Sequence, residues 1–403
     1  MSDLHSNQQP LPKPRLPRVV VWLGVVSLLT DIGTEAVYPL LPLFLSDVLH
    51  APRFFIGAVE GVAEATASLL KLVSGRITDS ARRRKPLTML GYGISSLVRP
   101  LVGLAMHPWH VLATRAADRV GKGLRSSPRD ALLADAAHAS ERGRVYGFHQ
   151  AMDNAGAVIG PLAATLLLGA GVALRNVFLL SAIPGALAMG ALFFGVREEA
   201  VTPNGTVRAP AEPIDAATRG KLTRYLVAIA IFGLGNSSDA FLLLRAGQCG
   251  VEVKHIPLLW MAHNVTKAAL STWAGALSDR YGRRRIIVGG WLLYGLVYLA
   301  FGVASHAWQM WALFVAYGIY YACAEGAGKA LVADLVPAHA RGRAFGWYNA
   351  TVGLVALPAS LSFGALSDRF GARTPFIISA LLAVAASVWL AVSLDSPRSG
   401  RAS

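Results

Sequence analysis

Acidic and basic side chains recur inside stretches of this sequence that are otherwise apolar. Asp31 and Glu35 stand four residues apart, and Glu60, Glu64 and Lys71 follow one another at spacings of four and seven. On a helix, each of these two groups lies on one face. An ionisable side chain at the centre of a bilayer costs roughly 2.5 kcal/mol or more, so it faces a cavity or a partner of opposite charge. Both groups are therefore candidates for proton exchange or for binding a polar solute.

The densest polar stripe lies between residues 115 and 129, where charged residues recur at every third or fourth position. Its members are Arg115, Asp118, Arg119, Lys122, Arg125 and Arg129. A continuous stripe at helical period cannot have lipid as its neighbour. A sparser set of candidates for a solute cavity is spread over the rest of the chain: Asp153, Asn236, Asp239, His263, Lys267, Tyr317, Tyr321 and Glu325.

A carboxylate that takes up a proton on one side of a membrane and releases it on the other can drive solute movement. One proton crossing a potential of 100 mV supplies about 2.3 kcal/mol. Asp31 and Glu35 are the leading candidates for this role, with Glu64 as a further one and Arg119 as their basic partner. We expect protonation of these acids and binding of the solute to exclude each other.

The alternative for each charge is internal neutralisation without any role in transport. The acids near residues 31–35 and 60–64 would pair with the bases of the 115–129 stripe. Asp118 with Lys122, and Glu325 with Lys329, have the spacing to pair within their own helices. Apolar residues would stabilise the helices equally well. The large number of charges therefore favours a role in function for the set as a whole.

The elements that must carry these residues are long apolar blocks. The chain has 403 residues, of which 54% are hydrophobic and 15% charged, well below the charged share of about a quarter in soluble domains. Blocks of roughly 20 residues can cross a bilayer. They lie near 19–45, 54–75, 88–106, 109–133, 145–168, 176–195, 223–244, 256–276, 286–304, 308–334, 344–366 and 374–394. The sequence predicts an all-α membrane protein with about twelve transmembrane helices.

The net charge of +15 follows the same topology. With the N-terminus in the cytoplasm, 23 of the 38 Lys and Arg residues lie in cytoplasmic loops or tails. Six lie on the outer side: Arg53, Arg175, Arg245, Lys254, Arg369 and Arg373. This asymmetry predicts that both termini are cytoplasmic, in a bacterial-type inner membrane. It accounts for the basicity without nucleic acid as a partner.

A polar, Pro-containing segment at residues 196–222 interrupts the apolar pattern and has the composition of a cytoplasmic linker. It separates two halves of six helices each, residues 19–195 and 223–394, with cytoplasmic tails at 1–18 and 395–403. Motifs recur between the halves at a spacing of about 200: GRITDSARRRKP at 75–86 matches GALSDRYGRRR at 275–285. The cysteines, Cys249 and Cys323, are expected to stay unpaired.

The repeated motif resembles the signature of the major facilitator superfamily between helices 2 and 3. The matching residues are Gly75, Asp79, Arg83 and Arg84 in the first half and Gly275, Asp279, Arg283 and Arg284 in the second. Residues 119–135 are similar to the helix 4 signature of the family, in which Arg119 is the signature arginine. Gly147, Gly156, Gly160 and Pro161 are similar to the helix 5 signature of its antiporter branches. The loop motif is implied to latch the two halves on the cytoplasmic side.

The resemblance covers residues 19–394 and implies a monomeric secondary transporter without a bound cofactor or metal. Our first interpretation is proton-coupled efflux of a small organic or drug-like molecule. The chain departs from the pattern at Lys122, Arg125 and the pair Ala164-Thr165. With the basic stripe, these departures keep a second interpretation open, which is proton-coupled import of a small, possibly anionic metabolite. A third is a membrane receptor that binds a ligand without moving it. We find no sequence pattern of an enzyme.

Overall fold

The computed structural model describes residues 16–80, 84–136, 142–198, 215–337 and 340–394, and within these ranges the ordered elements are helices. The side chains of residues 71–73, 75–80, 142 and 143 lie outside the description.

The first half of the chain supplies the following elements: α1 (Arg18–Val37), η1 (Tyr38–Leu40), α2 (Leu41–Leu43), η2 (Phe44–Val48), α3 (Arg53–Ser80), α4 (Lys85–Val98), η3 (Pro100–Leu104), α5 (Pro108–Asp135), α6 (Arg142–Gly169), α7 (Leu174–Leu180), α8 (Ala182–Gly190) and η4 (Ala191–Gly195). Several are continuous in space, so α1 to η2 form one rod, as do α4 with η3 and α7 to η4. Pro residues at 39, 42 and 100 locally shift the helical hydrogen-bond pattern at these joints.

The second half of the chain supplies these elements: α9 (Ala216–Gly235), α10 (Ala240–Gln248), η5 (Val253–His255), α11 (Ile256–Tyr281), α12 (Arg283–Val303), α13 (Ala307–Leu335), α14 (Arg341–Phe370) and α15 (Arg373–Ser393). Helix α9 begins inside the segment expected to be linker. The side chain of Asp215 accepts a hydrogen bond from the backbone N–H of Thr218 and caps this helix. That bond holds the pKa of Asp215 below its usual value.

Eight of the long helical segments in the described part of the chain have the length and apolar composition to cross a membrane. The described helices α3, α5, α11 and α13 are equally long but more polar, because they carry many of the charged and polar candidates. The molecule is therefore a multi-pass membrane protein.

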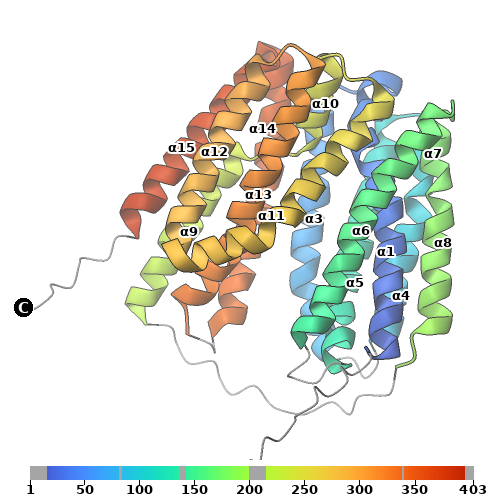
Figure 1. Cartoon of the computed structure of the whole chain (residues 1–403), viewed down its shortest axis with the longest axis horizontal. Helices are drawn as coiled ribbons and strands as arrows, with labels where there is room; N and C mark the ends of the chain where they lie inside the picture. The colour runs from blue at the N-terminus through green and yellow to red at the C-terminus, as the bar shows by residue number, and fades with distance from the viewer. Residues whose placement is uncertain (1–15, 81–83, 137–141, 199–214, 338–339, 395–403) are drawn as a thin grey trace, which may run out of the picture.

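The helices form two bundles that lie side by side (Figure 1). We call the end at which α4, α6, α9 and α14 begin the linker end, and the opposite end the distal end. The two bundles approach each other near the distal end and diverge toward the linker end, at the bottom of Figure 1. Helices α3 and α14 run antiparallel where the bundles meet.

Glycines permit this close approach of α3 and α14. A Cβ atom added at Gly61 would lie 2.9 Å from Cα of Leu357, and one at Gly364 would lie 2.5 Å from the backbone oxygen of Arg53. Small residues of this kind bring helix backbones together inside membranes. The positions span the distal part of both helices, so the halves are closely packed there.

Candidate functional site

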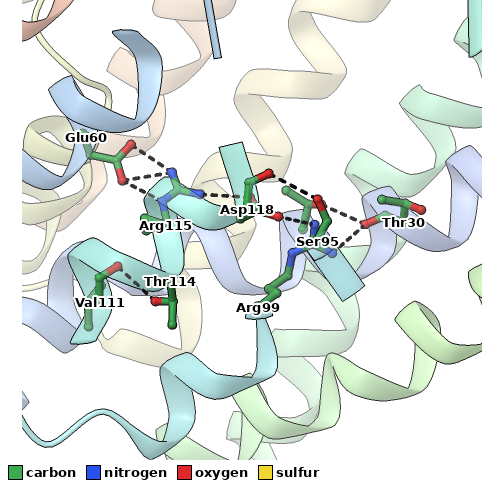
Figure 2. Close-up of polar contacts among 9 residues, drawn as sticks. Thr30, Glu60, Ser95, Arg99, Val111, Thr114, Arg115 and Asp118 are labelled. Carbon is green, nitrogen blue, oxygen red and sulfur yellow. Dashed lines mark hydrogen bonds and ion pairs between the residues drawn. The ribbon is translucent and has the colours of Figure 1, made fainter. Parts of the chain in front are cut away.

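Four charged side chains of the first half form a buried network (Figure 2). The Arg115 guanidinium on α5 donates from Nη2 to both carboxylate oxygens of Glu60 on α3, at 2.9 and 3.0 Å. Its Nη1 lies 3.9 Å from Asp118. Arg99, which follows α4, donates from Nη2 to Asp118 at 3.0 Å and from Nη1 to the backbone oxygen of Thr30 on α1 at 3.4 Å. Two positive and two negative charges from three helical segments therefore neutralise one another, and Arg99 also binds the backbone of α1.

This arrangement decides between the pairings that the sequence left open. Asp118 pairs with Arg99, which follows α4, and with Arg115 on its own helix. Lys329 and Glu325 do pair within α13, at 2.8 Å, and both are exposed. Glu60, Arg115 and Asp118 thus connect helices of the first half. The carboxylates of Glu60 and Asp118 are both occupied by ion pairs with arginines.

Asp31 and Glu35 lie on the face of α1 that packs against the glycines of α6. A Cβ atom added at Gly156 would lie 2.6 Å from Cβ of Asp31, and one at Gly160 would lie 3.2 Å from Cβ of Glu35. Two sets of candidates that were identified separately in the sequence therefore meet in space. Gly147 does not join them, because a Cβ atom there would meet no atom within 4 Å.

The Glu35 carboxylate reaches from the first half to the second. Its Oε2 accepts a hydrogen bond of 2.6 Å from the indole Nε1 of Trp260 on α11. The Trp260 ring lies 5.1 Å from the ring of Tyr38 on one side and stacks on His263 at 5.0 Å on the other. The protonation of a titratable acid at the interface of the halves can respond to a change in their relative position.

Asp153 on α6 is a second acid close to Asp31. Its Oδ1 accepts a hydrogen bond of 2.5 Å from Ser27 on α1 and lies 3.4 Å from Nδ1 of His149. Asp31 lies within electrostatic reach of Asp153 and Glu35 and, with opposite sign, of Lys122 and Arg125. Carboxylates of α1 and α6 are thus grouped opposite the basic stripe of α5.

The members of the basic stripe differ in burial and in their contacts. Arg115 is taken up by Glu60, and the Arg125 guanidinium lies 4.4 Å from the centre of the buried Tyr92 ring. Arg119 is also buried, and its Nε has no hydrogen-bond partner among the described residues. The expected ion pair of Arg119 with Asp31 or Glu35 is not among the contacts that the described residues form. Lys122, between them, is exposed.

The second half places Asp239 at a break between two helices. Helix α9 ends at Gly235 and α10 begins at Ala240, so residues 236–239 are not helical in the middle of a hydrophobic segment. Transporters often place solute sites at such interruptions, where freed backbone groups face a cavity. Oδ1 of Asp239 accepts a 2.5 Å hydrogen bond from the Tyr317 hydroxyl on α13.

Aromatic and basic side chains surround this break. The His263 ring lies 5.1 Å from Tyr317 and 5.2 Å from Tyr321, and Lys267 Nζ lies 5.5 Å from the centre of the Tyr321 ring. Nδ1 of His263 and Oδ1 of Asn236 are buried atoms without a hydrogen-bond partner in the described part of the chain. Glu35, Trp260, His263, Tyr317 and Asp239 therefore form a continuous path between the halves.

The loop motifs of the two halves make the same ion pair. Arg84 pairs with Asp135, and Arg283 Nε donates to Asp334 at 3.3 Å. In both cases the partners are 51 residues apart, and both pairs join the start of one helix to the end of the next. Internal duplication of the chain explains this correspondence.

The remaining motif residues divide by location. Asp279 pairs with Arg283 within its own half, Arg284 donates to the backbone oxygen of Ala391 at 3.2 Å, and Gly275 has open space beside it. Gly75 and Asp79 belong to the last turns of α3, but their surroundings lie outside the described side chains, and Arg83 lies outside the described residues.

Three features of the site were missed in the sequence. The sequence pattern does not single out Arg99, which holds Asp118, or Trp260, which binds Glu35. The break at 236–239 was expected to be continuous helix. Its signal was present, because Gly235 is followed by Asn236, Ser237, Ser238 and Asp239, all residues that favour turns over helix. Both cysteines are free, as expected.

Comparison with known proteins identifies the family. The family model of the Major Facilitator Superfamily matches residues 23–262 and 246–403. An uncharacterised MFS-type transporter of Methanocaldococcus jannaschii is 31% identical, with 93% of this chain and 94% of that protein covered. A multidrug resistance protein MdtH of Edwardsiella ictaluri is 26% identical over 81% of both chains.

Among solved structures, a bacterial homologue of the human lysosomal transporter Spinster, in an inward-facing and unoccupied conformation, superposes with a TM-score of 0.77. The match covers 94% of this chain and 98% of that one at 16% identity, which is evidence for the fold alone. The duplicated loop motif, the paired bundles and the matches over the length of the sequence lead to one conclusion: this chain belongs to the Major Facilitator Superfamily of membrane transporters.

Proposed function

We propose that this protein is a proton-coupled exporter of a small organic molecule. The observation that carries the proposal is the hydrogen bond from Trp260 to Glu35, because it links a titratable acid of one half to the other half. Neutralising Glu35 weakens that bond, since a charged acceptor binds a donor more strongly than a neutral one. Protonation then favours separation of α1 from α11, which couples proton uptake to movement of the halves.

The proposed cycle uses alternating access across twelve spans, with the polar helices α3, α5, α11 and α13 as inner members of the bundles. The positive-inside rule assigns the linker end, with both termini, to the cytoplasm of a bacterial-type inner membrane. The proton is the coupling ion, and the protein acts as a monomer without a bound cofactor. The similarity to a multidrug resistance protein supports the direction of export.

The solute site that we propose lies between the Glu35–Trp260 contact and Asp239. Trp260, Tyr317 and Tyr321 offer aromatic faces for an organic solute, and Asp239 and Lys267 offer charges of both signs. Such a set of a few polar groups among aromatic rings is typical of small-molecule sites.

One observation favours import of an anionic metabolite as the second candidate. Arg119 is buried with its Nε unpartnered, and Lys122 and Arg125 lie on the same helix. An anionic solute would supply the missing acceptor. A receptor without transport activity has no such observation in its favour, and a flux measurement separates it from both.

The test is proton movement in inside-out vesicles that contain the protein and have been energised to an acidic lumen. Addition of the exported compound from a panel is expected to release protons from the lumen. The Asp31→Asn/Glu35→Gln double variant should abolish this response. Asp47→Asn, which removes an exposed carboxylate at the distal end, is the matched control and should retain it. Normal responses in the double variant would overturn the assignment of the acids.

A further inference from the structure

The eight residues from Gly364 to Gly371 repeat the loop motif a third time. They read GALSDRFG, whereas residues 275–282 read GALSDRYG, so seven of the eight letters are identical. The two copies end helices at opposite ends of the molecule. Asp279 is near the end of α11 at the linker end, and Asp368 is near the end of α14 at the distal end. The third copy therefore lies where the two halves meet.

Asp368 caps a helix that belongs to the other half. Its Oδ1 accepts a hydrogen bond from the backbone N–H of Arg53 at 3.1 Å, and its Oδ2 accepts one from the N–H of Phe54 at 2.8 Å. These amides are in the first turn of α3, where a helix has no internal acceptors for them. The carboxylate also lies at the positive end of the helix dipole.

The side chain of Arg53 reinforces the same contact. Nη1 of Arg53 donates to the backbone oxygen of Ser367 at 3.1 Å and to its hydroxyl at 2.9 Å. Gly364 lets the two backbones touch, because a Cβ atom there would lie 2.7 Å from Cα of Phe54. The first half thus donates all four hydrogen bonds at this point, and the second half accepts them.

The copy at the linker end forms no such contact between the halves. Asp279 pairs with Arg283, which belongs to the same half. In the described part of the chain, a motif of nearly identical sequence therefore joins the halves at the distal end and does not join them at the linker end.

We propose that Asp368 and the first turn of α3 form a latch that holds the distal side closed. Movement of the halves apart at the distal end must break all four hydrogen bonds together, so the latch favours the state that is open at the linker end. The proposal rests on alternating access as part of the proposed function. Because α3 and α14 run antiparallel, Asp79 near the end of α3 and Asp368 near the end of α14 hold equivalent positions at opposite ends of this helix pair.

The experiment measures the distance between the halves at the linker end in the full-length protein without any solute. Spin labels are attached at Gln150→Cys on α6 and Ser271→Cys on α11, both exposed positions, in a background with Cys249→Ser and Cys323→Ser. Double electron–electron resonance in lipid nanodiscs then reports the populations of long and short distances. Asp368→Asn is compared with Asp279→Asn, the same change in the other copy of the motif.

Asp368→Asn is expected to raise the ratio of the short-distance to the long-distance population about fivefold, the effect of losing a helix cap of ordinary strength. Arg53→Gln removes the reinforcing bonds and should shift the ratio in the same direction. Asp279→Asn should not raise it. If neither latch variant changes the distance distribution while both remain folded, the proposal is wrong.

This outcome is separable from the fate of the proposed function. A shifted distance distribution in Asp368→Asn would support the latch. If the unaltered protein at the same time showed no proton-coupled transport, the transport proposal would be rejected. Normal transport with an unshifted distribution in both latch variants would do the reverse.

Discussion

Glu60 and Arg115 hold opposite charges in surroundings from which water is excluded. Both side chains are less than one tenth exposed, and the guanidinium binds the carboxylate through two nitrogens. A buried pair of this kind contributes little net stability compared with apolar residues, but removal of one partner strands the other charge. The network of Figure 2 therefore tolerates loss of a single member poorly.

Glu60→Gln is expected to destabilise the protein by about 3–5 kcal/mol, because Arg115 keeps its charge and loses its nearest acceptor. Lys329→Gln breaks the exposed pair with Glu325 and should cost at most about 1 kcal/mol. Denaturant unfolding in detergent micelles, followed by tryptophan fluorescence, measures both. Equal losses of unfolding free energy in the two variants would show that burial of the ion pair does not determine the cost of breaking it.

The sequence predicted individual partners where they share a helix, and only groups of partners between helices, such as the acids near 60–64 with the 115–129 stripe, of which Glu60 and Arg115 form a pair. The i, i+4 pair of Glu325 and Lys329 was expected and is present, since the helical period alone brings the two together. Asp118 had an equally spaced partner in Lys122 but pairs with Arg99 of another helix. Which helix faces which is decided by tertiary packing, and one sequence does not contain that information.

Glycines of α6 pack against α1, and this contact determines the positions of Asp31 and Glu35. A Cβ atom at Gly160 would lie 2.6 Å from the backbone oxygen of Ile32 and 2.9 Å from the nitrogen of Ala36. Backbone atoms cannot give way as a flexible side chain can, so a larger residue forces the helices apart. Asp31 and Glu35 would move with α1.

Gly160→Ala is therefore expected to destabilise the protein by about 1–3 kcal/mol, the usual cost of overpacking, and to reduce transport. Gly147→Ala lies in the same helix and the same motif but has open space around it. Its greater helix propensity should stabilise the protein by up to about 1 kcal/mol. Thermal unfolding of the purified variants distinguishes the two effects, which have opposite signs. A neutral Gly160→Ala would contradict the observed packing.

At the level of elements, apolar blocks of about 20 residues correctly indicated where long helices lie. They did not indicate where a helix breaks, because hydropathy averages over Asn236 to Asp239 and their apolar neighbours. They also did not show that α1 bends into η1 and η2 beyond Val37. Local turn residues and prolines determine such interruptions, and a window of 20 residues conceals them.

The whole molecule consists of two bundles whose contacts are concentrated near the distal end (Figure 1). Family membership and the all-helical architecture followed from the repeated loop motif together with the apolar blocks. The latch of Asp368 was not anticipated, although its letters repeat those of residues 275–282. The role of Asp368 depends on the end of α14 lying beside the start of α3, and this position is seen only in the folded structure.

The proposed orientation predicts which exposed positions can be labelled from outside the cell. Asp47→Cys at the distal end should react with a membrane-impermeant maleimide in intact cells, whereas Arg341→Cys at the linker end should react only after the cells are opened. The native cysteines are replaced by serine beforehand. Reaction of Arg341→Cys in intact cells would reverse the assigned orientation.

The network of Glu60, Arg99, Arg115 and Asp118 is complete within the first half of the chain. Ribosomes make this half first, so its buried charges can find one another before the second half has been translated. The partially made protein then carries these four groups into the lipid as a neutral set. By contrast, Glu35 must wait for Trp260, more than 200 positions later in the chain. We expect assembly to proceed in two steps, with Glu35 reaching its partner only when the second half is inserted.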